Sequence, residues 1–286
     1  MATFTNQAAL TYRGSVVNSN IVTGEIPETL TLTKDALSVT YEPNGSVIYI
    51  VNVVNSGDRA YSALTLSDDL GAYAFGTGTV TPLTFTEGSL SYYIDGVLQP
   101  ATAISVAPPL TVSGLSLPAN SVLTVVYRAE VNEFAPLGAD GQIVNTATLT
   151  GGGLTAPLSD SATVTVGETP RLDITKAITP VVIGADGQVT YTLTILNYGN
   201  TATVATDNVT VTDTFDPILD PISVTYNGVA WTAGVDYTYN STSGEFSSAP
   251  GAVTVPAATY VQDPDSGAWS VTPGQAVITV TGTISG

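Results

Sequence analysis

The chain contains only two lysines, and both stand where an apolar side chain is expected. Lys34 ends the alternating run Leu30–Lys34, and Lys176 ends the matching run Leu172–Lys176. Side chains two positions apart in a strand share a face, so each lysine is predicted to point into a core. A buried, unpaired ammonium group is costly, so each lysine needs a partner.

Two aspartates and two asparagines share this anomaly. Asp68 lies in the apolar phase of LTLSD, and Asp213 takes the same place in VTVTD. The strand around Asn145 reads IVNTATLT and the one around Asn6 reads FTNQAALT, with each asparagine in phase with the apolar residues. Both sets therefore place a carboxyl group or a carboxamide in a core.

A lysine, a carboxyl group and an asparagine in one core are the components of an isopeptide bond. Burial lowers the pKa of a lysine and raises that of a carboxyl group. The neutral amine can then attack the asparagine carbonyl, while the protonated acid polarises that carbonyl and shuttles protons, and ammonia leaves. We predict this bond between Lys34 and Asn145, with Asp68 as the catalytic acid.

Two alternatives remain open at this stage. The first is a buried Lys–Asp ion pair with asparagine as a hydrogen-bond partner, an arrangement that adds little net stability. The second is that Asn55 or Asn197, which also repeat and fall in phase, supplies the carboxamide. They precede Ser-Gly and Tyr-Gly at a strand end, so a turn role is the stronger expectation for both.

Composition narrows the fold and the partners. The chain has 286 residues, 43% hydrophobic and 10% charged, with a net charge of −18 and neither cysteine nor histidine. This excludes disorder, a disulfide framework and thiol chemistry, and argues against binding to nucleic acid or an anionic membrane. No apolar run is long enough to span a bilayer, so no membrane insertion is expected.

The sequence reads as strands that occur in two repeats. Short alternating runs of Val, Ile, Thr, Leu and Tyr are separated by turn residues, without a helical period, which predicts antiparallel Ig-like β-sandwiches. Aligning the lysines also aligns the Gly-x-Val-x-Tyr and Asn-x-Gly motifs of both repeats. Further on, Pro118 and Val122 align with Pro273 and Val277.

We expect the second repeat to lack its equivalent of Ile143–Thr150 and the N-terminal segment to supply that strand. Phe4, Asn6, Ala8 and Leu10 align with the inward positions of that strand. Asn6 precedes Lys34 by 28 positions and Asn145 precedes Lys176 by 31, so both strands are tethered alike. We therefore expect the N-terminal segment to complete the second domain of another copy, head-to-tail, rather than close on its own chain.

This arrangement predicts a second isopeptide bond, between subunits. Lys176 would join Asn6 of the neighbouring copy, with Asp213 as the catalytic acid. The predicted organisation is donor strands at 1–22, a linker at 23–29, an Ig-like domain at 30–166, a linker at 167–171, and at 172–286 an Ig-like acceptor domain that lacks its last strands.

The residues also resemble a known family. Gly187–Tyr191, Asn197–Asn200 and VTDT, followed in the first repeat by NTATLT and SATVTV, are similar to the bacterial conserved-repeat domain once labelled domain of unknown function eleven. The first repeat departs from the pattern at LSDDL. The resemblance implies Ig-like sandwiches in bacterial surface proteins. Size and domain content also resemble the structural proteins of clostridial spore appendages, which implies paralogous appendage proteins as further partners.

The resemblance bears on localisation. Met1–Phe4 show no basic region followed by an apolar stretch. Either a signal has been removed, or the protein reaches a spore or cell-surface appendage without the secretory pathway, as the resemblance implies. We expect an extracellular location.

The sequence contains only weak motifs for other functions. Asp68/Asp69 and Asp213/Asp216 could support glycoside hydrolysis, but they are adjacent loop acids without an aromatic platform nearby. Asp263–Gly267 or Asp207-Asn208 could bind calcium, but neither has the spacing of a defined loop, so both are expected to be acidic turn residues. We expect no enzyme activity beyond the autocatalytic bonds, no metal and no cofactor. The alternative function is a monomeric surface adhesin or carbohydrate-binding module that uses Trp231, Trp269 and the tyrosines.

Overall fold

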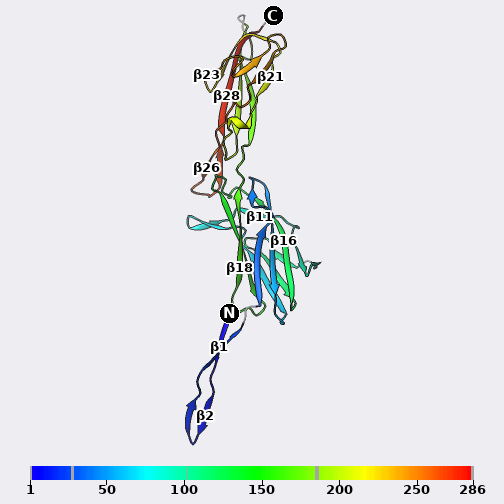
Figure 1. Ribbon diagram of the computed structural model, residues 1–286, viewed down its shortest axis with the longest axis vertical. Coiled ribbons are helices and arrows are strands. Elements are labelled where there is room, and N and C mark those ends of the chain that lie inside the picture. The colour runs from blue at the N-terminus through cyan, green and yellow to red at the C-terminus, as the bar shows by residue number, and fades with distance from the viewer. Residues whose placement is uncertain (1, 27–28, 101, 184–186, 285–286) are drawn as a thin grey trace. The chain divides into compact units, whose positions relative to one another are not determined.

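The computed structural model describes residues 2–26, 29–100, 102–183 and 187–284 (Figure 1). Apart from one short 3₁₀ turn at Ala205–Asp207, its regular elements are antiparallel strands, which confirms the all-β expectation. The chain divides into two compact units. Unit 1 comprises Met1–Pro136 and Gln142–Thr165, and unit 2 comprises Leu137–Gly141 and Val166–Gly286.

Unit 1 contains two six-stranded sheets. The first has the order β13-β12-β16-β7-β5, with β11 also paired to β16, and the second has the order β14-β15-β8-β17-β18-β6. The bounds of the first sheet are β5 Leu30–Ala36, β7 Ser46–Asn55, β11 Leu83–Phe85, β12 Ser91–Ile94, β13 Val97–Leu98 and β16 Ser121–Val131. Those of the second are β6 Thr40–Tyr41, β8 Tyr61–Asp68, β14 Ala103–Ser105, β15 Leu110–Leu117, β17 Gln142–Gly151 and β18 Leu158–Val166. A separate hairpin joins β9, Tyr73–Phe75, to β10, Gly78–Val80.

The core of unit 1 follows from alternation along its long strands. On β7, Val47, Tyr49, Val51 and Val53 are fully buried, while the residues between them are partly exposed. Strands β16 and β17 show the same period of two. Because successive side chains of a strand point to opposite faces, this pattern brings every second residue of both sheets into the core.

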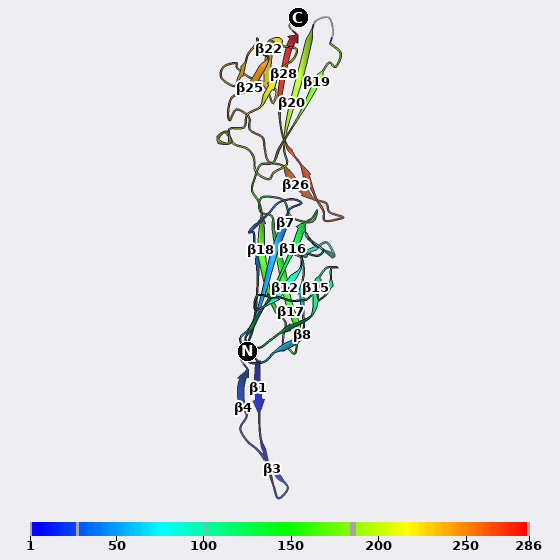
Figure 2. The same ribbon diagram turned by 90° about the vertical axis from the view of Figure 1, so that its right-hand side faces the viewer.

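Unit 2 has one large sheet and one small sheet. The large sheet has the order β19-β20-β28-β22-β23, of which β19, β20, β28 and β22 are labelled in Figure 2. The small sheet has the order β21-β25-β24. The large-sheet bounds are β19 Leu172–Thr179, β20 Gln188–Asn197, β22 Leu219–Tyr226, β23 Val229–Ala230 and β28 Gly274–Ile284. The others are β21 Thr212–Thr214, β24 Tyr237–Tyr239 and β25 Glu245–Ser248, with a hairpin of β26 Thr259–Gln262 and β27 Trp269–Thr272.

The N-terminal segment is a long hairpin, drawn in dark blue in Figures 1 and 2, and each of its two arms contains two short strands. Strand β1, Ala2–Asn6, pairs with β4, Val22–Ile26, and β2, Ala9–Tyr12, pairs with β3, Ser15–Asn18. Arg13 and Gly14 form its tip with φ angles of 47° and 85°, the positive values that tight hairpin turns require. Among the described residues, these four strands pair only with one another.

Candidate functional site

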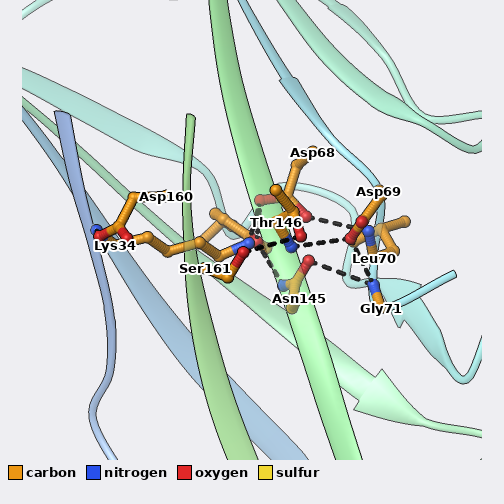
Figure 3. Close-up of polar contacts among 10 residues, drawn as sticks. Lys34, Asp68, Asp69, Leu70, Gly71, Asn145, Thr146, Asp160 and Ser161 are labelled. Atoms are coloured by element: carbon orange, nitrogen blue, oxygen red, sulfur yellow. Dashed lines mark hydrogen bonds and ion pairs between the residues drawn. The ribbon is translucent and has the colours of Figure 1, made fainter. Parts of the chain in front are cut away.

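The structure brings Lys34, Asp68 and Asn145 together in the core of unit 1 (Figure 3). They come from β5, β8 and β17, and their exposed fractions are 3%, 2% and 0%. Lys34 Nζ lies 2.6 Å from Asp68 Oδ2. The alternation of the three strands therefore places all three polar side chains on inward faces, as their sequence phase predicts.

Asp68 receives two further hydrogen bonds. The Tyr127 hydroxyl donates to Asp68 Oδ2 over 2.6 Å, and the Leu70 amide donates to Asp68 Oδ1 over 3.0 Å. Lys34 also lies over two rings, 4.8 Å from the centroid of Tyr49 and 5.9 Å from that of Tyr127. The aromatic walls keep the pair dry while contributing a cation–π attraction.

Asn145 is held at both ends of its carboxamide. Its Nδ2 donates to the Tyr127 hydroxyl over 3.0 Å, and its Oδ1 accepts the Gly71 amide over 3.2 Å. Gly71 has a φ of +74°, and a Cβ there would lie 2.5 Å from Ile143 Cγ2, so the position requires glycine. A backbone donor on Oδ1 polarises the carbonyl that an amine would attack.

Burial controls protonation at this site. Burial lowers the pKa of Lys34, and the neighbouring Asp68 carboxylate only partly opposes that effect. Burial also raises the pKa of Tyr127 well above its ordinary value, so that its hydroxyl stays protonated. A buried ion pair is also the arrangement from which an isopeptide bond would form, so this contact fits both expectations drawn from the sequence.

Strand β18 closes the site on its outer side. Asp160 Oδ2 accepts the backbone amide of Lys34 over 2.8 Å, and Asp69 Oδ1 accepts that of Thr146 over 2.8 Å. Two carboxylates thus fasten the β17–β18 hairpin to the rest of unit 1. Sequence reasoning missed Asp160, Tyr127 and Gly71, and it considered Asp69 only for glycoside hydrolysis, because turn acids and strand tyrosines are common in any sandwich.

Unit 2 carries a similar but open site. Lys176 Nζ lies 2.5 Å from Asp213 Oδ2, and the two side chains are 39% and 16% exposed. Lys176 lies over the rings of Tyr191 and Phe215, at 4.5 and 5.2 Å from their centroids. The structure therefore brings Lys176 and Asp213 together, whereas Asn6 lies in β1, in the other unit.

The Lys176–Asp213 site is exposed because the small sheet of unit 2 has fewer described strands than the corresponding sheet of unit 1. In unit 1, β8 pairs with both β15 and β17, but among the described residues its counterpart β21 pairs only with β25. On β19, Leu172 is 42% and Ile174 is 49% exposed, whereas Leu30, the counterpart of Leu172, is 4% exposed. The inner face of β19 and one edge of β21 are thus uncovered.

The two competing asparagines have turn roles. Asn55 Nδ2 donates to the carbonyl groups of Arg59 and Pro118, and Asn197 Nδ2 donates to those of Thr201 and Pro256. The Oδ1 atoms accept the amides of Gly57 and Gly199 respectively. The expected turn role of Asn55 and Asn197 is confirmed.

Other candidate sites can be placed as well. Asp263 Oδ1 accepts the amides of Asp265 and Ser266 and the Ser266 hydroxyl, so this acid organises its own turn. Within the described ranges, no cluster of three His, Cys, Asp or Glu side chains that could hold a metal ion is found. No described helix is long and apolar enough to cross a membrane.

No protein-family model and no curated protein sequence matches the chain. Among solved structures it is similar to the pilus backbone RrgB of Streptococcus pneumoniae, with 12% identity and a TM-score of 0.36 over 86% of this chain, and it spans 55% of that chain. The major pilin BcpA of Bacillus cereus gives 11% identity, a TM-score of 0.37 and coverages of 94% and 73%. The collagen adhesin CNA of S. aureus gives 12% identity and a TM-score of 0.31, and the match covers 52% of this chain and 55% of that chain.

Proposed function

We propose that this protein is the structural subunit of an extracellular fibre, such as a cell-surface or spore appendage. It polymerises head-to-tail when the N-terminal hairpin of one copy completes unit 2 of the next. The observation that carries the proposal is the match between that hairpin and the β17–β18 hairpin of unit 1, the element for which unit 2 has no counterpart among its described strands.

The pairing of β1 with β4 supports this match beyond the sequence alignment. In unit 1, Asn145 pairs with Ala162, and in the N-terminal hairpin, Asn6 pairs with Val22. Two residues earlier, the Ile143↔Val164 pair corresponds to Phe4↔Gly24.

The Phe4↔Gly24 pair presents one large apolar side chain. A Cβ on Gly24 would lie 2.4 Å from the ring of Phe4, so the ring covers the glycine. One large ring over a glycine stands at the place that isoleucine and valine occupy in unit 1. The hairpin thus offers an apolar side chain where the core of unit 1 buries Ile143.

The apolar side chains of the hairpin are exposed when it stands alone. Phe4 is 54%, Leu10 is 67% and Val22 is 55% exposed. In unit 1 the corresponding Ile143, Leu149 and Ala162 are 1%, 0% and 7% exposed. Full burial of a large apolar side chain contributes about 1.5–3 kcal/mol, so docking has a substantial driving force.

Docking in this register would also complete the second reactive site. Asn6 corresponds to Asn145, and Lys176 and Asp213 correspond to Lys34 and Asp68. Burial of Lys176 and Asp213 under the incoming hairpin would create the dry environment that the unit 1 site already has. The bond between Lys176 and Asn6 would then form after docking and weld one subunit to the next.

Denaturing gel electrophoresis with peptide mass spectrometry of assembled protein tests the proposal. We expect a ladder of multimers, a peptide that joins Lys176 to Asn6, and a loss of about 17 Da for each ammonia released. A single monomer band of full mass would show that neither isopeptide bond forms. A monomer that contains the Lys176–Asn6 link would indicate self-closure, and a stable monomer without it would favour the adhesin or carbohydrate-binding alternative.

A further inference from the structure

The Tyr127 hydroxyl occupies a position between the acid and the leaving group of the unit 1 site. It donates to Asp68 Oδ2 over 2.6 Å and accepts from Asn145 Nδ2 over 3.0 Å. Asp68 Oδ2 in turn lies 2.6 Å from Lys34 Nζ. A continuous hydrogen-bonded chain therefore runs from the lysine through Asp68 and Tyr127 to the amide nitrogen of Asn145.

Tyr127 is suited to pass a proton without holding a charge. Its exposed fraction is 1%, and its ring stacks on Tyr49 at a centroid distance of 5.5 Å. A fixed, buried hydroxyl is both donor and acceptor, so it can take a proton on one side while it releases one on the other. Its fixed position keeps both transfers within hydrogen-bond distance.

We propose that Tyr127 is a catalytic proton relay for the Lys34–Asn145 condensation, delivering a proton from Asp68 to the departing ammonia. This inference rests on the proposed isopeptide bond in unit 1 and adds a residue and a route to it. The route explains how Asp68, which contacts the lysine, serves a leaving group that is bonded to Tyr127.

The protons balance along this route. The Lys34 ammonium gives one proton to the Asp68 carboxylate, and the resulting amine attacks Asn145 Cγ. The oxygen of the tetrahedral intermediate is held by the Gly71 amide, which already donates to Oδ1. Nδ2, no longer conjugated with a carbonyl, has a basic lone pair and takes a proton from Tyr127, which takes one from Asp68.

The step ends with one bond made and one broken. The Cγ–Nδ2 bond breaks and ammonia leaves, while Nζ gives its second proton to Asp68 as the amide forms. Lysine ammonium, carboxylate and carboxamide thus become an amide, a protonated Asp68 and ammonia. No oxidant, reductant or other reactant is required.

The described positions of unit 2 that correspond to Tyr127 carry no hydroxyl. The sheet register pairs Tyr127 with Tyr49 on β7, and the corresponding pair on β28 and β20 is Val280 with Tyr191. The ring that stacks on Tyr191 is Phe215, at 5.2 Å, in place of Tyr127 on Tyr49. Neither Val280 nor Phe215 has a hydroxyl, so neither can take the part of Tyr127 at the Lys176 site.

Tyr127→Phe tests the proposal because it keeps the ring and removes only the hydroxyl. The readout is peptide mass spectrometry of the full chain at increasing times after synthesis, with the Lys34–Asn145 link scored separately from the Lys176–Asn6 link. We expect the Lys34–Asn145 bond to form about 10²–10⁴-fold more slowly, the usual contribution of a positioned proton-transfer group. The bond at Lys176 should keep its rate.

Tyr41→Phe is the matched control. Tyr41 is also a buried tyrosine of unit 1, 2% exposed, but its hydroxyl donates to the Pro136 carbonyl and not to the reacting groups. The Tyr41→Phe variant should form the Lys34–Asn145 bond at the wild-type rate. Circular dichroism confirms that each variant is folded.

A Tyr127→Phe protein that condenses at the wild-type rate would overturn the relay. Wild-type protein that never loses ammonia at Lys34 would instead overturn the proposed bond itself, so the two failures are distinguishable. If Tyr127→Phe does not fold, 3,5-difluorotyrosine at position 127 keeps ring and hydroxyl but makes the phenol more acidic. A relay predicts a changed rate, and an unchanged rate would refute it.

Discussion

Leu10→Ala should weaken assembly by an amount that the structure allows us to estimate. Leu10 is 67% exposed in the hairpin, and its counterpart Leu149 is fully buried in unit 1. Docking would therefore remove about two thirds of a leucine side chain from water, which contributes about 1–2 kcal/mol. The cavity left by alanine adds to this loss, because a docked core relaxes only in part.

Such a loss corresponds to a Kd for subunit association that is about 5- to 30-fold higher. The assay is sedimentation of fibres over a range of concentrations, in a Lys176→Ala background, so that association stays reversible. Thr5→Ala is the control, because Thr5 corresponds to Val144, which is 44% exposed on the outer face of β17. If Leu10→Ala assembles at the same concentration as Thr5→Ala, Leu10 is not buried by docking and the proposed insertion is wrong.

Three further predictions concern the Lys176–Asn6 bond, the N-terminal hairpin and the buried Lys34. Lys176→Ala should still form fibres, but heating in detergent should dissolve them to monomers on a gel, unlike wild-type fibres. Deletion of residues 1–22 should give monomers by light scattering, with a thermal transition of unit 2 that resembles that of the unassembled full chain; fibres from this variant would exclude hairpin exchange. In Asn145→Ala, Lys34 stays titratable, and burial lowers its pKa below the ordinary 10.5. Between the two values the unfolded chain binds the proton and the folded chain does not, so the free energy of unfolding should rise with pH there, by at most about 1.4 kcal/mol per pH unit. Urea titrations against Lys34→Met in the same background isolate this slope, and equal slopes would show that Lys34 has no lowered pKa.

Much of the fold and of the unit 1 site could be predicted from the sequence, because both depend on a period of two. A polar residue in the apolar phase of a strand must enter the core, which identified Lys34, Asp68 and Asn145 without a structure. Asp68 and Asn145 adjoin because β8 pairs with β17, and the Ala147↔Asp68 pair sets Asn145 on the same face, while Lys34 reaches Asp68 from β5 of the other sheet. The repeat supplied the same expectation for Lys176 and Asp213.

The same period limits what the sequence can reveal. The alignment of Val122 with Val277 is wrong by two residues. Val122 pairs with Val54 in unit 1, and Leu196, the equivalent of Val54 in unit 2, pairs with Gln275. Val122 therefore corresponds to Gln275. A shift of two keeps every side chain on its face, so alternation cannot detect it.

The shift also hid the difference between the two sites. Only the register shows that Val280 stands at the place of Tyr127, and only the structure shows Phe215 filling the ring position. Tyr127 itself follows the apolar phase of β16, where a tyrosine is expected to pack rather than to join a polar network.

An engineered disulfide offers the most direct test of hairpin exchange, because the chain has no cysteine of its own. Thr148 pairs with Ser67 in unit 1, and the corresponding positions are Ala9 in the hairpin and Thr212 on β21. Directly opposed residues of antiparallel strands lie about 4.5–5.5 Å apart between Cα atoms, within the range of a disulfide.

We would therefore oxidise fibres of the Ala9→Cys, Thr212→Cys variant in a Lys176→Ala background and run them on a non-reducing denaturing gel. Hairpin exchange predicts a ladder of multimers that reducing agent converts to monomer, with a disulfide-linked peptide that joins the two substituted positions between copies. A disulfide confined to single chains at every protein concentration, or no disulfide at all, would contradict the exchange of the hairpin between subunits.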